Sequence, residues 1–297
     1  MKAIVRRKRG KIDVVELERP VPKKNEVLIK VHAATVIQGD VMILKVPSIM
    51  FPLMRLLSGY KGKKIQGTEY SGVVEAVGLE VTQFKPGDEV WGLTTKEKMG
   101  GQAEFTVVSS SGIISKKPSN VGHIEAVTLL VGPMTAIQLL SKRDIISRKK
   151  VMIYGASGSV GTFAVQVAKK HGATVTAVCS ERNFNIVKEL GADIVLDYKS
   201  QAFLDHSEEY DLVFDAVGKM KKADRKRLRK EGGGFISTWS STKETTDSLK
   251  EIREMVESGQ LKTYIDKLYT LDEAVEAYQY VRSGRKRGNV VLAIVDQ

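Results

Sequence analysis

The chain contains one cysteine, Cys179, in 297 residues, which excludes an internal disulfide and fits a reducing compartment. It has no apolar run that approaches the roughly 20 residues of a membrane-spanning helix. The first residues, MKAIVRRKRGKIDVVEL, lack the apolar core of a secretory signal. Tandem repeats and low-complexity linkers are also absent. These absences predict a cytoplasmic protein without a membrane partner.

The sequence has an ordinary globular composition but an unusual charge. Hydrophobic residues make up 42% and charged residues 28%, and the length is sufficient for two domains. The net charge of +12 is compatible with nucleic acid, a membrane surface or an anionic cofactor. The densest basic run, KKADRKRLRK (221–230), has no aromatic residue for base stacking. We therefore interpret this run as a solvated helix face, and nucleic acid is disfavoured as a partner.

The first part of the chain, up to about residue 118, is rich in short β-type runs. Turn signals such as KPGD and GG separate these runs. The pattern predicts a β-dominated domain with Greek-key character. The predicted strands include residues 27–34, 71–78, 88–93 and 103–108.

From residue 121 the pattern changes to helices that alternate with short strands rich in valine and isoleucine. Such strands are typical of a parallel sheet covered on both faces, and the alternation predicts a doubly wound sheet. Gly191 is a candidate left-handed cap for the helix that begins near residue 183. A last helix (270–284) and strand (288–295) are expected to return to the first domain. The predicted strands of the sheet cover residues 151–156, 174–179, 193–198, 211–218 and 234–240.

The stretch GASGSVG (155–161) has the glycine spacing of a dinucleotide-binding turn. Three glycines alone are weak evidence, but a strand precedes this stretch, and a helix and a second strand follow it in order. Gly158 would let the backbone approach a pyrophosphate, and Gly161 would let the helix pack closely on the sheet. The predicted phosphate-binding residues are Gly155, Ala156, Ser157, Gly158, Ser159, Val160 and Gly161.

The end of the next strand, AVCSERN, bears on the choice of nicotinamide cofactor. A carboxylate at this strand end selects NAD because it accepts hydrogen bonds from the ribose 2′-hydroxyl. Here Ser180 and Arg182 suit the 2′-phosphate of NADPH, whereas Glu181, if it points inward, favours NADH. We predict NADPH as the cofactor and keep NADH as the alternative.

Several blocks together resemble the medium-chain dehydrogenase/reductase superfamily, specifically its zinc-free quinone oxidoreductase branch, which is zeta-crystallin-like. The blocks are GTEYSGVVEAVGLEVTQFKPGDEVWGL (67–93), GGQAEFTVV (100–108), KPSNVGHIEAVTLLVGPMTA (117–136), YGASGSVGTFAVQVAKKHGA (154–173), YDLVFDAVGK (210–219) and the segment from residue 270 to 292. The resemblance covers nearly the whole chain. It implies an α/β fold with a Rossmann doubly wound sheet at 120–262 and a GroES-like, β-rich substrate domain at 1–119 and 263–297.

The resemblance also implies roles for single residues. Ser180, Arg182 and Tyr198 would surround the adenosine ribose and its phosphate, and Thr135 would approach the nicotinamide. Packing at strand ends is the alternative interpretation of Tyr198 and Val217. The remaining residues implied to lie along the nicotinamide or to close over the cofactor are Val217, Gly218, Ser237, Thr238, Trp239, Gly288 and Asn289.

The chain departs from the quinone reductase pattern at two places. Ile37 stands where asparagine is usual, so that Gln38 is the candidate for a polar contact to the nicotinamide or the substrate. The apolar segment 46–64 has no counterpart in that pattern, and it is expected to line the substrate entrance or to lie in a subunit interface. The predicted substrate contacts are Ile37, Gln38 and Trp239.

Zinc-dependent members of the superfamily use cysteine, histidine and carboxylate ligands. A single cysteine excludes their four-cysteine structural site. Ile37 occupies the cysteine position of their catalytic site, and Thr68 occupies the histidine position. The histidines show no ligand spacing and are interpreted as surface or helix-end residues: His32, His123, His171 and His206. We therefore expect no zinc.

Without a Lewis acid, hydride addition to a conjugated acceptor is easier than reduction of a simple ketone, because the developing charge is delocalised. The prediction is an NADPH-dependent reductase of quinones or α,β-unsaturated carbonyls, with Tyr60 as a candidate proton donor. Two alternatives stay open, an alcohol dehydrogenase-like reductase of small carbonyls and an NADPH-binding sensor or nucleic-acid-binding module with little turnover. The segment GFISTWSSTKETT (234–246) could supply a sheet edge, which predicts a homodimer.

Overall fold

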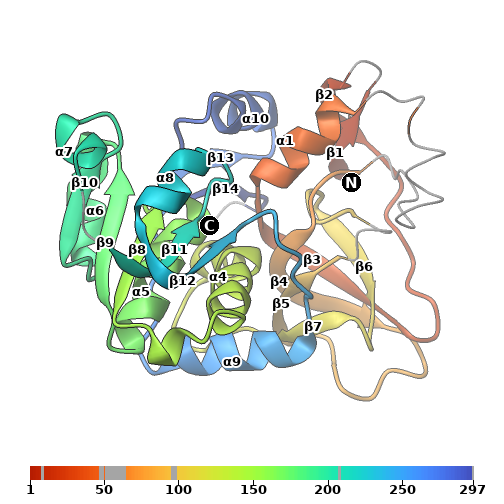
Figure 1. Cartoon of the computed structure of the whole chain (residues 1–297). Coiled ribbons are helices and arrows are strands. Elements are labelled where there is room, and N and C mark those ends of the chain that lie inside the picture. Colours follow the sequence, from red (N-terminus) through yellow and green to blue (C-terminus); the bar gives the residue numbers. More distant parts are fainter. Residues whose placement is uncertain (8–9, 47–49, 51–64, 95–98, 207–208, 296–297) are drawn as a thin grey trace. The chain divides into compact units, whose positions relative to one another are not determined.

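A computed structural model describes residues 1–7, 10–46, 50, 65–94, 99–206 and 209–295. The chain divides into two compact units. Unit 1 comprises residues 1–130, 245–253 and 265–297, and unit 2 comprises residues 131–244 and 254–264. Figure 1 labels their strands and most of their helices. The domain boundaries at 119/120 and 262/263 stay a prediction.

Unit 1 is built on an antiparallel sheet around the ten-residue strand β3. Strands run in the order β13-β14-β3-β4-β5-β7, β6 also pairs with β3, and β1 and β2 form a separate hairpin. Hydrophobic side chains of β3, β4 and β5 form one buried cluster, since alternate residues of each strand point to the same face. The strands are β1 (Lys2–Arg6), β2 (Ile12–Glu16), β3 (Glu26–Thr35), β4 (Glu69–Val77), β5 (Glu89–Leu93), β6 (Phe105–Ser109), β7 (Ile113–Lys116), β13 (Ile265–Thr270) and β14 (Asn289–Ala293).

The helices of unit 1 are short. The last of them packs its apolar face, which includes Ala274, Tyr278 and Val281, into a second buried cluster. The predicted return of the tail is confirmed, because β14 pairs with β3. The sequence analysis missed β13, which pairs in parallel with β14. The helices are α1 (Gln38–Lys45), α3 (His123–Ala126), the 3₁₀ turn η3 (Val127–Leu129) and α10 (Ala274–Arg282).

Unit 2 contains the predicted parallel sheet, in the order β10-β9-β8-β11-β12. When the five strands are numbered from β8 in the order of the chain, the order across the sheet is 3-2-1-4-5. This order is that of the first five strands of a dinucleotide-binding sheet. Every residue of β11 is buried, as expected for a strand covered on both faces. The strands are β8 (Lys150–Tyr154), β9 (Thr174–Cys179), β10 (Ile194–Asp197), β11 (Tyr210–Asp215) and β12 (Arg229–Ser237).

Helices connect the strands of unit 2, and α5 packs on β8 and β9. Gly191 has φ +102°, which confirms the predicted left-handed residue after α6. The predicted basic helix is also present as α8. The helical elements are α4 (Val131–Ser141), η4 (Ile145–Ser147), α5 (Ser159–Lys170), η5 (Glu181–Asn183), α6 (Phe184–Glu189), α7 (Gln201–Leu204) and α8 (Lys222–Arg227), while α9 (Thr246–Glu257) is divided between the units.

One helical stretch of the described chain, His123–Ser141, is long and apolar enough by length and composition to cross a membrane. The sequence-based statement that no apolar run approaches this length is therefore wrong. The stretch comprises α3, η3 and α4, and 61% of its most apolar window is buried within the structure. A buried core helix passes the same test, so this is weak evidence for a membrane segment.

Candidate functional site

The turn after β8 has the close backbone approach that its glycines predict. Gly155 has φ +78°, a conformation that side chains with a Cβ rarely adopt. The backbone N–H groups of Gly155 and Ala156 both donate to the carbonyl oxygen of Val178, at 2.8 and 3.1 Å. A Cβ on Gly155 would lie 2.1 Å from Cγ2 of Val217. The turn is therefore held against β9 and against the residues that follow β11.

The same turn leads directly into α5. Gly158 is the N-cap of this 12-residue helix, and a Cβ on Gly161 would lie 2.2 Å from the carbonyl oxygen of Gly155. The N–H groups in the first turn of a helix have no partner within the helix, and the helix dipole makes this end positive. The arrangement can hold an anionic group such as a pyrophosphate.

Two polar side chains that the sequence analysis did not single out hold this region in place. The carboxylate of Asp215 is fully buried and accepts hydrogen bonds from the N–H groups of Val217, Gly218 and Met220, at 3.1, 2.8 and 2.8 Å. Asn183 donates a 2.9 Å hydrogen bond to the hydroxyl of Ser157. An aspartate at the end of a strand, just before a glycine-containing turn, is the sequence signal for the first of these.

Cys179 lies at the end of β9 beside Ser157. Burial raises the pKa of its thiol to about 12, while a hydrogen bond with Ser157 acts in the opposite direction. Because the thiolate is the reactive form, Cys179 is a packing residue of the turn and not a nucleophile.

The residues predicted to surround the adenosine follow two neighbouring strands. Cys179 of β9 is paired with Asp197 of β10, so Ser180 and Tyr198 leave adjacent strands at the same edge of the sheet. Arg182 is exposed, and 38% of the Tyr198 surface is accessible. Its ring also lies 6.5 Å from the ring of Tyr154 in an edge arrangement, so the cofactor role and the packing role of Tyr198 both stay predictions. Lys199, whose ammonium lies 5.6 Å from the centre of the Tyr198 ring, was not singled out from the sequence.

The predicted nicotinamide-side residues of unit 2 are also brought together. The indole N–H of Trp239 donates a 3.0 Å hydrogen bond to the carbonyl oxygen of Gly218. Ser237 is paired with Asp215, and the N–H of Thr238 donates to the Asp215 carbonyl. Trp239 is 71% exposed and Val217 is 43% exposed, so large apolar surfaces face solvent beside the strand ends.

Thr135 lies near the start of α4, one turn after Gly132. A Cβ on Gly132 would lie 2.9 Å from the ring of Phe163 and 3.0 Å from Oγ of Ser159, so the two helix starts lie side by side. The predicted cofactor residues of unit 2 thus lie at or just after the carboxyl ends of its strands, except for Thr135, which lies near the start of α4. In doubly wound sheets this edge, at the reversal of strand order between β8 and β11, binds the ligand. The glycine cradle fits the pyrophosphate of a nicotinamide dinucleotide.

In unit 1, Ile37 and Gln38 stand at the start of α1. The N–H of Ile37 donates a 2.9 Å hydrogen bond to the carboxylate of Asp40, which caps the helix. Gln38 is exposed, whereas Asp40 is buried. Burial raises the pKa of Asp40 to about 7, a neighbouring Glu69 also raises it, and the hydrogen bonds from Ile37 and Gln102 oppose both effects.

Asp40 belongs to a buried polar network that the sequence analysis did not foresee. The amide of Gln102 donates to the Thr35 carbonyl at 2.7 Å and to Asp40 at 3.4 Å. Tyr278 donates a 2.7 Å hydrogen bond to the Gln102 carbonyl oxygen, and the Thr35 hydroxyl donates to Glu69. The network fixes the start of α1 and the position of Glu69.

Gly288 and Asn289 are the two residues predicted to close over the cofactor; Gly288 directly precedes β14, and Asn289 is its first residue. Both are buried, and Gly288 has φ +51°. The ammonium of Lys286 donates a 2.7 Å hydrogen bond to the Gly288 carbonyl. Burial lowers the pKa of Lys286 to about 8, although Glu69 and Asp266 act to raise it.

The interpretation of the histidines as surface or helix-end residues is wrong for His32, which is half-buried within β3. His123 begins α3, as a helix-end residue does, but it is not scattered from the other histidines. The rings of His32 and His123 lie 4.5 Å apart, since β3 and α3 pack against each other. Nδ1 of His123 lies 2.8 Å from the Ser71 hydroxyl, and its Nε2 lies 3.2 Å from Glu89. Burial and the neighbouring His32 lower the pKa of His123 to about 4.

Within the described ranges, no group of three or more histidine, cysteine or acidic side chains is placed to hold a metal ion. Tyr60, the candidate proton donor, and most of the apolar segment 46–64 lie outside the described residues, so those two predictions stay untested by the structure.

Comparison with known proteins agrees with this geometry. An alcohol dehydrogenase GroES-like domain model matches residues 23–119, and two models of zinc-binding dehydrogenases match residues 159–236 and 222–292. The bovine (Bos taurus) mitochondrial NAD(P)H oxidoreductase RTN4IP1 is 33% identical, with 91% of this chain and 82% of that protein covered. The chloroplastic NADPH-dependent alkenal/one oxidoreductase of Arabidopsis thaliana is 30% identical over 98% of this chain and 79% of that protein.

The 2-methylene-furan-3-one reductase of Solanum lycopersicum is 31% identical over 95% of this chain and 76% of that protein. Among solved structures, the quinone oxidoreductase from Coxiella burnetii superposes with a TM-score of 0.88 and 25% identity, covering 99% of both chains. The predicted combination of a GroES-like domain and a Rossmann-like sheet is confirmed. The chain belongs to the medium-chain dehydrogenase/reductase superfamily, on its quinone-oxidoreductase-like side.

Proposed function

We propose that this protein is an NADPH-dependent oxidoreductase that transfers hydride to a quinone or to the C=C bond of an α,β-unsaturated carbonyl compound, without zinc. The names of the relatives support this reaction class, because they include an alkenal/one oxidoreductase, a 2-methylene-furan-3-one reductase and a quinone oxidoreductase. The observation that carries the proposal is the glycine cradle at the start of α5. A Cβ at Gly155 or at Gly161 would clash with neighbouring atoms, so only glycine leaves the room that the turn has there.

The residues of unit 2 divide the binding of the cofactor between them. The first turn of α5 would hold the pyrophosphate, and Asp215 fixes the backbone at Val217 and Gly218, along which the nicotinamide ribose would lie. Trp239 supports the same backbone through Gly218 and offers an apolar surface that excludes water. When bound, NADPH supplies a hydride from its nicotinamide ring.

Preference for NADPH over NADH is supported by the side chains at the ends of β9 and β10. Ser180 offers a hydroxyl, and Arg182 offers the planar guanidinium that matches phosphate oxygens. Lys199 adds a second positive charge beside Tyr198. Glu181 is exposed on the same turn, and it is the feature that a preference for NADH would use.

Zinc-independent chemistry is supported by the donor set of unit 1. Ile37 and Thr68 stand at the positions of the cysteine and histidine ligands and offer neither a thiolate nor an imidazole. The Glu69 carboxylate already accepts a hydrogen bond from the Thr35 hydroxyl. Zinc sites require cysteine, histidine or carboxylate ligands in tetrahedral array. An acceptor that delocalises the incoming charge by conjugation fits such a site better than an isolated carbonyl.

Hydride addition leaves an enolate or a hydroquinone anion that needs a proton. Tyr60 remains the proposed donor, and a Tyr60→Phe enzyme with unchanged kcat would remove it from the mechanism. The proposal as a whole is tested by NADPH oxidation with but-3-en-2-one and 1,4-benzoquinone as acceptors. Acceptor-dependent oxidation supports it, whereas tight NADPH binding without turnover on either acceptor supports the sensor alternative.

We also propose that two copies of the chain pair through β12. This strand is at the edge of the sheet, with β11 as its neighbour in the described part of the chain. An open edge presents unpaired backbone groups to a second strand. A monomeric mass in light scattering would contradict this. Cytoplasmic localisation stays a prediction.

A further inference from the structure

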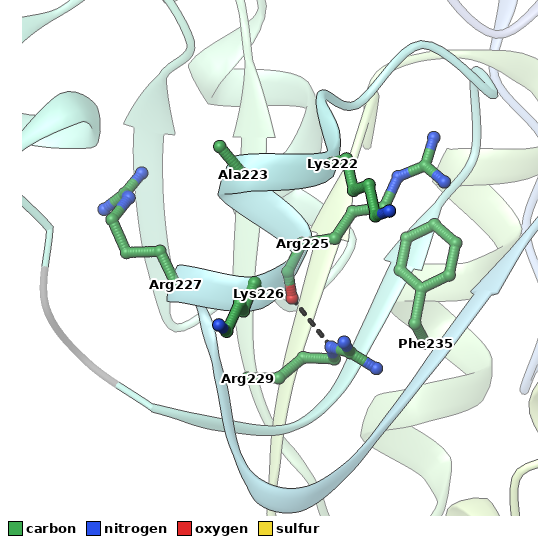
Figure 2. Close-up of a pocket in the computed structure, with 7 residues that line it drawn as sticks. All are labelled: Lys222, Ala223, Arg225, Lys226, Arg227, Arg229 and Phe235. Carbon is green, nitrogen blue, oxygen red and sulfur yellow. Dashed lines mark hydrogen bonds between the residues drawn. The ribbon is translucent and has the colours of Figure 1, made fainter.

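The basic run that the proposed reaction does not use surrounds a cavity in unit 2. The cavity has a volume of about 970 Å³ and lies at α8 and β12. Figure 2 shows its seven lining residues, and Lys222, Arg225 and Arg229 extend on the same side as the ring of Phe235. The full lining is Lys222, Ala223, Arg225, Lys226, Arg227, Arg229 and Phe235.

Five of these seven residues carry a positive charge, and none carries a negative one. Lys222 and Lys226 are exposed and form no ion pair with any residue that the structure describes. Arg227 differs, because it contacts Asp224 at 3.3 Å and points away from the other arginines in Figure 2. Four cations of the lining are therefore available to an anion that enters from solvent.

The arginines are held in fixed positions. The guanidinium of Arg225 lies 4.6 Å from the centre of the Phe235 ring, and its Nε donates a 2.9 Å hydrogen bond to the Met220 carbonyl. Nε of Arg229 donates a 2.7 Å hydrogen bond to the Arg225 carbonyl, drawn as a dashed line in Figure 2. Because the Nε atoms of Arg225 and Arg229 already donate hydrogen bonds within the protein, the terminal guanidinium nitrogens of these two side chains are the atoms that would contact an anion. The planar edge of a guanidinium matches two oxygens of a phosphate group.

We propose that this cavity binds a linear oligophosphate chain. A single phosphate would occupy little of about 970 Å³, a volume at the upper end of that of small-molecule sites. Successive phosphates along a chain suit cations that follow one another along α8 and into β12. The lining contains no residue of the proposed cofactor site, and we expect the two sites to bind their ligands at the same time.

The same observations disfavour a nucleic acid as the ligand. Sequence-tolerant binding of single strands uses aromatic rings on which bases stack. Phe235 is the one aromatic residue of the lining, and Arg225 already covers its ring. The cavity therefore offers contacts to phosphate oxygens and no stacking surface for bases.

The test is calorimetric titration of the full-length protein with sodium tripolyphosphate in the presence of saturating NADPH, which keeps the cofactor site filled. We expect one binding event whose affinity falls as salt is added. Lys222→Glu should weaken it by about tenfold, and Arg225→Lys, which keeps the charge but loses the fork, by about threefold. Lys188→Glu, an equal charge change at an exposed position of α6, is the matched control and should leave the affinity within about twofold.

A second titration with ATP distinguishes the source of the phosphates. Equal affinity for ATP and tripolyphosphate indicates a bare chain, and tighter ATP binding indicates a nucleoside triphosphate. Three results would overturn the proposal: no binding in the presence of NADPH, an equal loss in Lys188→Glu, or tighter binding of a single-stranded RNA that depends on Lys222. Circular dichroism and an unchanged Kd for NADPH confirm that each variant is folded and that the cofactor site is intact.

Discussion

The carboxylate of Asp215 accepts a 2.8 Å hydrogen bond from the backbone N–H of Gly218, three residues further along the chain. The carboxylate is fully buried and accepts two more N–H groups of the same turn, from Val217 and Met220. A buried carboxylate is stabilised in this way because each hydrogen bond compensates for lost hydration. Asp215 therefore sets the backbone path along which we place the nicotinamide ribose.

Asp215→Asn tests this positioning role. The amide keeps the shape of the side chain, but its NH₂ group would face a backbone N–H and leave that donor unsatisfied. We expect the free energy of unfolding to fall by about 2 kcal/mol, with weaker NADPH binding. Urea denaturation and calorimetry measure the two effects. Asp205→Asn, at an exposed position, should change neither, and a similar loss in that control would contradict the role of Asp215.

Gly161→Ala tests the close packing of α5 on the turn. The new Cβ would lie 2.2 Å from the Gly155 carbonyl oxygen, so backbone atoms must move. We expect a loss of at least about 2 kcal/mol in stability and no measurable NADPH binding. Gly172, in contrast to Gly161, has a positive φ of 77° and open space around it, so Gly172→Ala should cost only about 1 kcal/mol while binding is retained. Normal binding by Gly161→Ala would exclude the phosphate cradle.

Arg182→Ala addresses the cofactor preference. If the guanidinium contacts the 2′-phosphate, its removal should lower kcat/KM for NADPH by about tenfold or more and leave kcat/KM for NADH within about twofold. Steady-state assays of the wild type and the variant give kcat/KM for NADPH and for NADH. An equal loss with NADPH and NADH would place Arg182 outside the phosphate contact.

His123 predicts a pH dependence of stability. Burial, chiefly, lowers its pKa in the folded protein from 6.5 to about 4, with His32 adding to the shift and Glu89 opposing it. The unfolded chain therefore binds the extra proton more readily, so this contribution is complete above pH 6.5 and is lost as the pH falls toward 4. Over this window the wild type should lose about 2 kcal/mol more stability than His123→Gln. The free energy of unfolding is measured by denaturation at each pH for both proteins. Curves for the wild type and His123→Gln that fall equally between pH 6.5 and pH 4 would contradict this.

The sequence predicts the sheet of unit 2 well because β8, β9, β10 and β11 each contain a continuous apolar run and alternate with helices. The same holds for the phosphate turn, in which glycine spacing and flanking elements agree. Strand ends were less predictable. The segment 229–233 reads as a charged and glycine-rich turn, yet β12 begins at Arg229, with a shift of register opposite Tyr210 and Leu212. Tertiary pairing overrides the local preference there.

The residues that the sequence did not reveal depend on partners far away in the chain. His32 and His123 approach each other only because α3 packs on β3. Asp40 and Gln102 meet through the folding of unit 1, and neither lies in a spacing pattern. Asn183 and Ser157 belong to successive turns of the sheet edge. Local patterns identify the backbone cradle, whereas the polar contacts that stabilise it require the fold.

The most direct test of the proposed reaction is the rate of NADPH oxidation by chelator-treated protein with but-3-en-2-one as acceptor, with the metal content measured on the same sample. Zinc-independent hydride transfer predicts acceptor-dependent oxidation that chelation leaves unchanged, in protein without stoichiometric zinc. Loss of the rate on chelation and its return with added zinc would contradict that conclusion.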